Sequence, residues 1–373
     1  MRFVDEYRAP EQVMQLVEHL QARAHLLPHT AGHPLRIMEV CGGHTHAIFK
    51  FGLDQLLPEN IEFIHGPGCP VCVLPMGRID TCIDIASRPG VIFCTFGDAM
   101  RVPGKNGSLL QAKSRGADVR IVYSPMDALK LAQQNPQREV VFFGLGFETT
   151  MPATALTLRQ ARERNVDNFF FFCQHITLLP TLRSLLDQPD NSIDAFLAPG
   201  HVSMVIGTEA YGFIASDYRR PLVVAGFEPL DLLQGAVMLV EQTIAQRSQV
   251  ENQYRRVVPD EGNPLAQAAI ADVFCLSGDS EWRGLGVINN SGVRLTPAYQ
   301  RFDAEAHFQP APQRVCDDPR ARCGDVLTGR CKPHQCPLFG QVCNPQSAFG
   351  ALMVSSEGAC AAWYQYRSQE NEA

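Results

Sequence analysis

The sequence contains no long hydrophobic run and no excess of positive charge. Its apolar stretches, such as Val140–Phe143 and Phe169–Cys173, are much shorter than the ~20 residues of a membrane-spanning helix. Residues 1–30 mix acidic with apolar side chains, unlike the apolar core of a signal peptide. With 32 Lys and Arg against 39 Asp and Glu, the chain also lacks the cationic surface that binds nucleic acid phosphates. We therefore expect a cytoplasmic protein that binds neither membranes nor nucleic acid.

Cysteine, in contrast, is abundant. The chain has 13 cysteines among 373 residues, of which 45% are hydrophobic. This is enough apolar material for two or three domains, so the chain does not need disulfides in place of a core. In a reducing compartment such thiols more often hold metal or undergo redox chemistry. The cysteines are therefore the first place to look for function.

From about residue 35 the sequence repeats a short apolar run, a turn rich in Gly or Pro, and a stretch with helical periodicity. This pattern predicts βαβ units and parallel sheets. The eight predicted strands are 35–40, 61–64, 91–96, 119–123, 139–143, 168–173, 195–197 and 222–225. A (β/α)₈ barrel would also have eight strands. Two α/β lobes are favoured because the residues before about 35 and after about 250 lie outside the repeat.

The predicted fold class is therefore α/β, with two parallel-sheet βαβ lobes and a small cysteine-rich iron-sulfur domain. The expected divisions are an N-terminal helical segment 1–34, a first lobe 35–125, a second lobe 126–250 and an iron-sulfur domain 251–373. Six of the 13 cysteines lie close together in the last of these, between Cys316 and Cys360, in addition to Cys275.

The loops after parallel strands meet at one edge of a sheet, and here two of these loops carry cysteines. Cys41 follows the first predicted strand in CGGHTH, at the start of a predicted helix whose dipole favours the thiolate. It is a candidate nucleophile or metal ligand, with a buried core cysteine as the alternative. Cys69 and Cys72 in GPGCPVC have the spacing of a disulfide or a shared metal site.

Histidines and glutamates occur in the same set of loops. His44, His46 and His201 are candidates for binding metal, donating protons or capping loops. Glu148 and Glu228 each follow a Gly-Phe pair at the end of a predicted strand. A carboxylate placed there could act as an acid or a base near the thiols.

The cysteines near the C-terminus suit an iron-sulfur cluster or zinc, since both take four thiolates. Their wide, irregular spacing and the scarcity of hydrophobic residues around them favour the cluster. Cys331 is left as a spare thiol and Cys316 as a solvent-facing one. The predicted cluster ligands are Cys323, Cys336, Cys343 and Cys360.

Along essentially its whole length the chain resembles the HypD family of hydrogenase maturation factors. The matching motifs, in order, are CGGHTH at 41–46, GPGCPVCVLP at 66–75, GFETT at 146–150, PGHVSMVIG at 199–207 and RCGDVL…CPLFG…C…MVSSEGAC at 322–360. Leu352 departs from the family pattern, because many relatives have cysteine there, and many lack Cys331. Cys331 therefore stays open as a substitute cluster ligand.

The resemblance implies assembly of the Fe(CN)₂CO unit of [NiFe] hydrogenases, in a complex with a HypC-type chaperone. Cyanide would come from HypE, with HypF upstream, and the chain would be monomeric on its own. The resemblance implies that Cys41 binds the iron and that Cys69 and Cys72 act as a redox relay or as further iron ligands. A [4Fe-4S] cluster held by the C-terminal cysteines would supply electrons.

The residues that the resemblance places around this site are His44, Glu148, His201 and Glu357. Whether such a scaffold is also an enzyme stays open. An alternative function is an iron-sulfur-dependent protein disulfide reductase, in which Cys41 would form the mixed disulfide. A zinc-stapled interaction module is less favoured, because it gives the loop motifs no role.

Overall fold

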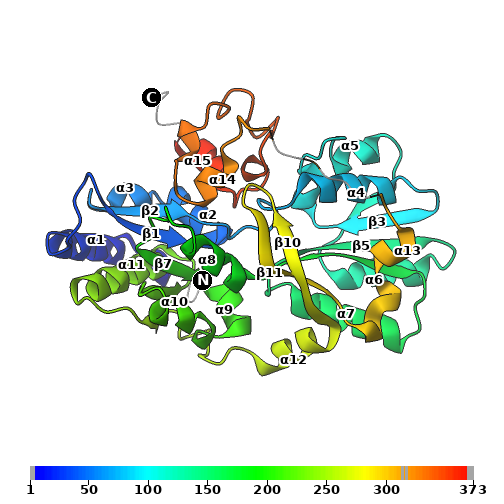
Figure 1. Cartoon of the computed structure of the whole chain (residues 1–373), viewed down its shortest axis with the longest axis horizontal. Helices are drawn as coiled ribbons and strands as arrows, with labels where there is room; N and C mark the ends of the chain where they lie inside the picture. The colour runs from blue at the N-terminus through cyan, green and yellow to red at the C-terminus, as the bar shows by residue number, and fades with distance from the viewer. Residues whose placement is uncertain (1–4, 312–314, 316–317, 368–373) are drawn as a thin grey trace.

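The computed structural model describes residues 5–311, 315 and 318–367. Two parallel sheets with helices around them, an antiparallel hairpin and a cysteine-rich C-terminal region make up this part of the chain (Figure 1). The predicted α/β class with parallel sheets and a cysteine-rich region is therefore confirmed. Neither sheet closes on itself, so the described residues do not form the alternative (β/α)₈ barrel. No helix in those ranges is both long and apolar enough to cross a membrane.

The first sheet has five parallel strands, with β7 at its centre. The strand order is β2-β1-β7-β8-β9. These strands are β1 (Leu35–Glu39), β2 (Ile61–His65), β7 (Ala195–Pro199), β8 (Leu222–Ala225) and β9 (Val250–Asn252). All residues of β7 and β8 are buried, and alternate residues enter two different apolar clusters. Both faces of this sheet are thus covered, as is usual for parallel strands.

The second sheet has four parallel strands in the order β4-β3-β5-β6. They are β3 (Val91–Thr95), β4 (Val119–Ile121), β5 (Glu139–Gly146) and β6 (Phe169–His175). The phenylalanines of β5 and β6 alternate between two apolar clusters, one on each face. All eight strands predicted from the sequence are present as β1 to β8.

The chain order of the strands does not match their division between the sheets. β1 and β2 pair with the late strands β7 to β9, while β3 to β6 form the second sheet between them. Each predicted lobe, 35–125 and 126–250, therefore supplies strands to both sheets. The difference arises because β1 pairs with β7, from Ile37 opposite Ala195 to Glu39 opposite Leu197. Strand spacing along the chain carries no information about such distant pairing.

The helices begin at residues suited to helix starts, with proline in the first turn of α1, α6, α11 and α12. The α-helices are α1 (Pro10–Ala24), α2 (Gly42–Lys50), α3 (Leu53–Leu56), α4 (Met76–Ala86), α5 (Leu109–Ser114), α6 (Pro125–Gln134), α7 (Met151–Glu163), α8 (Leu178–Leu186), α9 (Gly200–Ile206), α10 (Gly212–Ser216), α11 (Pro229–Ile244), α12 (Pro264–Val273), α13 (Ala304–Phe308), α14 (Cys323–Leu327) and α15 (Ala359–Arg367).

The segment after residue 250 serves more than one part of the fold. β9 completes the first sheet, so the predicted boundary at 250 falls within that strand. The hairpin of β10 (Phe274–Trp282) and β11 (Gly286–Leu295) rises from α12 toward the C-terminal region (Figure 1). There α14 and α15 lie above α2, at the top of the view (Figure 1). The cysteine-rich region is thus placed against the loops that follow β1 and β2.

Candidate functional site

Cys41 lies at the carboxyl end of β1, where the chain turns into α2. It is the N-cap residue of α2, and its side chain is buried. We call residues 40–46 the Cys41 loop and residues 66–75 the Cys69 loop. A Cβ atom at Gly68 would lie 2.2 Å from the Cys41 backbone nitrogen, so glycine is required for the two loops to approach this closely. The Gly42 N–H donates to the Gly68 carbonyl at 3.3 Å. The adjacent strands β1 and β2 thus bring the two thiol-bearing loops together.

His201 contacts the Cys41 thiol. Its Nδ1 atom lies 3.7 Å from Cys41 Sγ. His201 stands in the first turn of α9, which follows β7, and β7 pairs with β1. The ring of Phe227, after β8, has its centroid 5.0 Å from that of His44 and 5.1 Å from that of His201. Three neighbouring strands of the first sheet, β1, β7 and β8, therefore bring these side chains together.

Burial controls the protonation of Cys41. It raises the pKa of the thiol well above its ordinary value, and the charges of Glu39 and Glu357 raise it further. The backbone amides of Gly43 and His44 lower the pKa, but by less. The N-terminus of α2 thus favours the thiolate, as predicted, but desolvation outweighs this effect. The raised pKa favours the protonated thiol in the structure described.

The two histidines near Cys41 are neutral. Burial lowers the pKa of His44 to about 3, with a smaller contribution from the charge of His201. Neither ring nitrogen of His44 has a well-aligned hydrogen bond, although the carbonyls of Ala225 and Gly226 lie near the ring. Burial also lowers the pKa of His201 to about 4. Both imidazoles therefore have an unprotonated nitrogen at neutral pH, as metal binding or proton uptake requires.

Cys69 and Cys72 form a buried pair of thiols. The Cys72 thiol donates to Cys69 Sγ, and the two sulfur atoms are 2.6 Å apart. Burial raises the pKa of Cys72 well above its ordinary value, and the neighbouring Cys69 raises it further. A Cβ atom at Gly358 would lie 3.1 Å from Cys72 Sγ. The pair therefore lies between the Cys41 loop and the C-terminal region.

The segment 354–358 connects three parts of the molecule. The Ser355 hydroxyl donates to Asp98 in the second sheet's β3 loop at 2.8 Å. His46 Nδ1 in the Cys41 loop lies 3.1 Å from the Ser356 carbonyl oxygen. His46 is thus held by the backbone of this segment, which matches the loop-capping alternative among its predicted roles.

Glu357 lies beside the Cys41 loop, where the family resemblance implies it. A Cβ atom at Gly42 would lie 2.6 Å from Glu357 Cβ. The Glu357 side chain reaches solvent, but the protein around its carboxylate raises its pKa, and Asp98 adds to this shift. Asp98 was not singled out from the sequence, because its position beside segment 354–358 depends on folding.

Glu148 follows β5 in the second sheet and is buried. Leu178 N–H donates to its Oε1 at 3.0 Å, while Oε2 has no hydrogen-bond partner. Burial raises the pKa of Glu148 to about 7. The charges of Glu148 and Cys41 both raise the pKa of Tyr211, so this phenol lies within electrostatic reach of both groups. Glu148 thus lies close to the first sheet's site, with Tyr211 near both.

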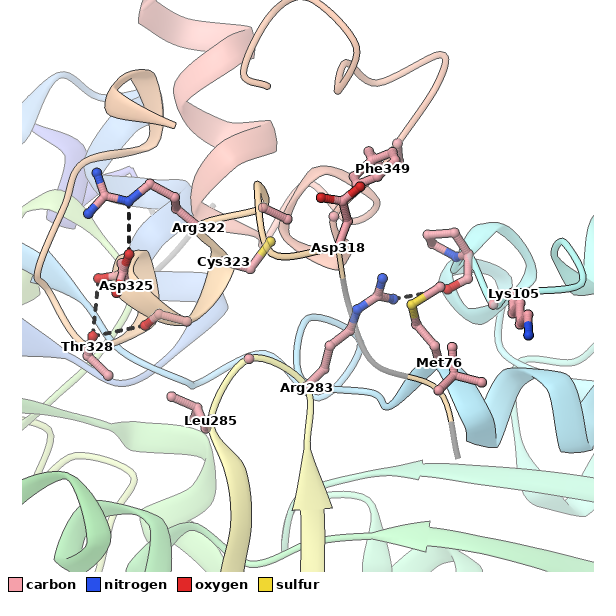
Figure 2. A pocket seen from close by; sticks show the side chains of 18 of the residues that line it. Met76, Lys105, Arg283, Leu285, Asp318, Arg322, Cys323, Asp325, Thr328 and Phe349 are labelled. Carbon is pink, nitrogen blue, oxygen red and sulfur yellow. Dashed lines mark hydrogen bonds and ion pairs between the residues drawn. The ribbon is translucent and has the colours of Figure 1, made fainter. Parts of the chain in front are cut away.

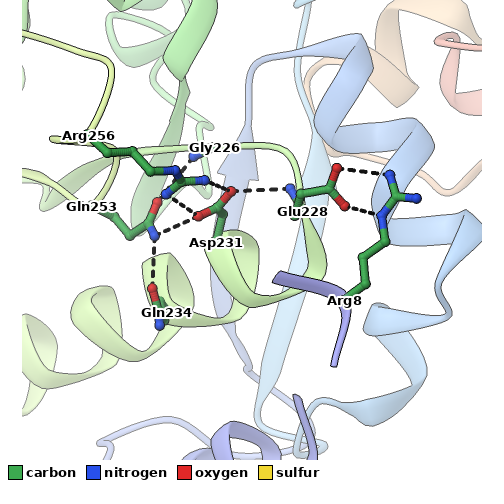
Figure 3. Close-up of polar contacts among 7 residues, drawn as sticks. All are labelled: Arg8, Gly226, Glu228, Asp231, Gln234, Gln253 and Arg256. Carbon is green, nitrogen blue, oxygen red and sulfur yellow. Dashed lines mark hydrogen bonds and ion pairs between the residues drawn. The ribbon is translucent and has the colours of Figure 1, made fainter. Parts of the chain in front are cut away.

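Glu228, in contrast, takes part in an ion pair and a helix cap. Arg8 binds its carboxylate with two hydrogen bonds, one of them 2.9 Å long, and Glu228 caps the start of α11 (Figure 3). Beside it, buried Asp231 pairs with Arg256 at 2.7 Å and 2.8 Å (Figure 3). The acid–base role suggested for Glu228 is therefore not supported, because its carboxylate is neutralised by Arg8.

The four predicted cluster ligands line one small cavity. Its volume is about 20 Å³, and apolar side chains including Phe339, Leu352 and Met353 complete its wall. Burial raises the pKa of Cys360 well above its ordinary value, and the other cysteines add to the shift. The cysteines on the wall are Cys323, Cys336, Cys343 and Cys360.

This donor set fits an iron-sulfur cluster, since four soft thiols face a space walled by apolar side chains. A volume of about 20 Å³ holds little more than one water molecule. Among the described residues, no three Cys, His, Asp or Glu side chains already form a metal-binding group. The surrounding loops would therefore move apart when a cluster binds.

Cys331 faces a different space. It lines a cavity of about 420 Å³ between β2 and the C-terminal region. Its charge still contributes to the raised pKa of Cys360, so it lies near the four-cysteine cavity. Cys316 lies outside the described residues.

Cys323 also borders a wider cavity of about 740 Å³ (Figure 2). Arg283 from the turn of the hairpin and Lys105 from the segment between β3 and α5 line the same cavity (Figure 2). Cys323 therefore separates the small four-cysteine cavity from a wider space between the sheets and the C-terminal region.

The sequence did not reveal two further residues beneath Cys41. Glu39 is fully buried at the end of β1, and His65 ends β2. The available signal was the position of Glu39, a charged residue between Met38 and Val40 in a strand predicted to be buried.

Comparison with known proteins gives a consistent result. The sequence model of the HypD family, described as "Hydrogenase formation hypA family", matches residues 11–367. The chain is 84% identical to hydrogenase maturation factor HypD of Escherichia coli (strain K12), over 373 residues and the whole of both chains. It is 56% identical to hydrogenase maturation factor HypD of Rhodobacter capsulatus, over 370 residues and 98% of each chain. The chain therefore belongs to the HypD family of hydrogenase maturation factors.

Proposed function

We propose that the chain is a scaffold on which the Fe(CN)₂CO unit of [NiFe] hydrogenases is assembled, with Cys41 as its iron ligand. The arrangement around Cys41 carries this proposal: a buried thiol with a neutral imidazole nitrogen 3.7 Å away and a second thiol pair on the adjoining loop. A soft thiolate suits iron(II) that also binds cyanide and carbon monoxide. Membership of the HypD family supports the same role.

Iron binding requires Cys41 to lose its proton. The high pKa of the buried thiol prevents this in the metal-free protein. An incoming cation lowers the pKa of its ligand, and the neutral Nδ1 of His201 is close enough to accept the proton. His44 and Glu357 border the same space, and Glu148 can hold or release a proton near pH 7.

The Cys69/Cys72 pair would exchange electrons with the site. A [4Fe-4S] cluster bound by the four C-terminal cysteines supplies electrons when present. Reduction of a Cys69–Cys72 disulfide takes two electrons and two protons and yields two thiols. Gly358 packs against Cys72, and Cys360 is two residues further along the chain. The redox pair and the C-terminal cysteines are thus connected by one short segment.

The proposed partners follow from the family. A HypC-type chaperone would share the iron, and HypE would deliver cyanide, with HypF upstream. On its own the chain would be a monomer, working in the reducing cytoplasm where its thiols stay reduced.

The proposal is tested by purifying the chain without oxygen together with its chaperone and recording the infrared spectrum. We expect stretching bands of metal-bound cyanide and carbon monoxide. Their absence from a complex that contains iron would overturn the proposal.

A protein disulfide reductase is a second candidate, because Cys69 and Cys72 already lie within bonding reach of each other. This activity would reduce a partner's disulfide in protein that carries no iron at Cys41. Turnover of a disulfide substrate by such protein, with no infrared bands in the chaperone complex, would favour the reductase.

A further inference from the structure

A buried hydrogen-bond network lies directly beneath Cys41, and its centre is Glu39. The Glu39 side chain is 0% exposed. Its Oε2 atom accepts the backbone N–H of Cys41 at 3.0 Å. Its Oε1 atom accepts a hydrogen bond from His65 Nδ1 at 2.7 Å and another from the Thr45 hydroxyl. Three donors thus converge on one carboxylate.

These donors come from the two thiol-bearing loops. Thr45 belongs to the Cys41 loop, and its hydroxyl also lies 3.2 Å from the Cys41 carbonyl oxygen. His65 is the residue immediately before the Cys69 loop. The Glu39 carbonyl accepts the N–H of Gly66, the first residue of that loop, at 2.8 Å. Glu39 therefore binds to both loops through its side chain and its backbone.

His65 is itself fixed from the other side. Its ring centroid lies 4.8 Å from that of Phe49 in α2, and His65 borders the cavity of about 420 Å³ beside β2. Burying a carboxylate costs free energy unless hydrogen bonds compensate for the lost water. The donors around the Glu39 carboxylate therefore show which parts of the chain it holds in place.

We infer that Glu39 is a positioning residue for iron binding: its carboxylate holds the Cys41 backbone and the Cys69 loop in one fixed arrangement, with the Cys41 thiol directed at His201. The inference rests on the proposed function, because it assigns Glu39 a role toward the same iron substrate. Groups that orient a metal ligand commonly change metal affinity by about 10–100-fold when they are altered.

The test compares four variants. Glu39→Gln keeps the size of the side chain but replaces one acceptor oxygen with an NH₂ donor. At the Oε2 position this NH₂ group faces the Cys41 N–H, and at the Oε1 position it removes the acceptor of the hydrogen bonds from His65 and Thr45. His65→Leu removes the Nδ1 donor, whereas His65→Asn retains an N–H near that position. Thr45→Ser retains the hydroxyl and is the matched conservative control.

The first measurement is the rate at which iodoacetamide alkylates Cys41 in the metal-free chain, followed by peptide mass spectrometry. Cys82, fully buried in α4, is the internal reference for global unfolding. We expect Glu39→Gln and His65→Leu to raise the Cys41 rate at least about 10-fold relative to Cys82. His65→Asn and Thr45→Ser should stay within about threefold of the unmodified chain. An unchanged Cys41 rate, a parallel rise at Cys82, or no rescue by His65→Asn would overturn the inference.

The second measurement is the iron bound per chaperone complex at limiting iron(II). Glu39→Gln should lower the affinity by about 10–100-fold while Thr45→Ser does not. Equal iron binding by Glu39→Gln and the unmodified chain would contradict the positioning role. If the unmodified chain binds no iron, the proposed function fails, but the alkylation result still decides whether Glu39 fixes the Cys41 loop.

Discussion

At the scale of single residues, burial shifts the protonation of the reactive groups around Cys41 toward their neutral forms. It raises the pKa of the Cys41 thiol and of Glu148, and it lowers the pKa of His44 and His201. Neutral groups can sit close together without repulsion in a space that excludes water. A cation entering this space would therefore displace protons, so we expect iron binding to strengthen as pH rises.

The raised pKa of Glu148 predicts how the unfolding free energy depends on pH. Its pKa rises from 4.5 to about 7 on folding, so between those pH values the native chain holds a proton that the unfolded chain has lost. Its contribution to the unfolding free energy is therefore largest at low pH and falls as pH rises through this window. Between pH 5 and pH 8 the fall is about 2–3 kcal/mol.

Glu148→Gln should remove this fall, which denaturant unfolding at the two pH values measures. The exposed Glu163→Gln serves as the control and should keep the pH dependence of the unmodified chain. A Glu148→Gln variant with that same dependence would show that the carboxyl is not protonated in the native state.

At the scale of elements, the loops after β1 and β2 depend on glycine for their close contact. The sequence predicted both strands and both loops, since buried strands and Gly-rich turns are visible in local pattern. It did not predict the hydrogen bonds from Thr45 and His65 to Glu39, because these join residues from separate elements. The hairpin β10–β11 was also missed, since Gly278, Asp279 and Ser280 interrupt its apolar residues.

Gly68→Ala should separate the two loops. Its Cβ atom would lie 2.2 Å from the Cys41 backbone nitrogen and the Val40 carbonyl carbon, so the backbone must move. We expect a loss of about 1–3 kcal/mol in the unfolding free energy and faster alkylation of Cys41. Gly212→Ala is the control, because a Cβ atom there meets nothing within 4 Å. Equal stability of the two variants would show that the loops do not need this contact.

At the scale of the whole molecule, the two sheets and the C-terminal region meet at segment 354–358. The strands of the first sheet come from both sides of the second sheet in the sequence. The four cysteines chosen from the sequence line the small cavity, and Cys331, which the sequence left open as a substitute ligand, does not line it. The sequence analysis assigned some strands to the wrong lobe. β1 pairs with β7, more than 150 residues away, and the local sequence pattern gives no sign of such a distant pairing. The segment 354–358 then joins the cysteine-rich region to both sheets.

Cys336→Ala should remove the visible absorption of an iron-sulfur cluster, because it deletes one of the four thiols on the cavity wall. Cys331→Ala is the matched variant and should keep that absorption, since its thiol lines the separate cavity beside β2. Anaerobic absorption spectra with analysis of iron and acid-labile sulfide measure both. Loss of the absorption in Cys331→Ala, with its retention in Cys336→Ala, would show that Cys331 is a cluster ligand and Cys336 is not.

The assignment of iron to Cys41 is tested most directly by the infrared spectrum of the chaperone complex containing Cys41→Ala. We predict that the bands of metal-bound cyanide and carbon monoxide disappear, while the absorption of the C-terminal cluster stays at the level of the unmodified chain. Bands of unchanged intensity in Cys41→Ala would contradict the assignment and place the iron at Cys69 and Cys72.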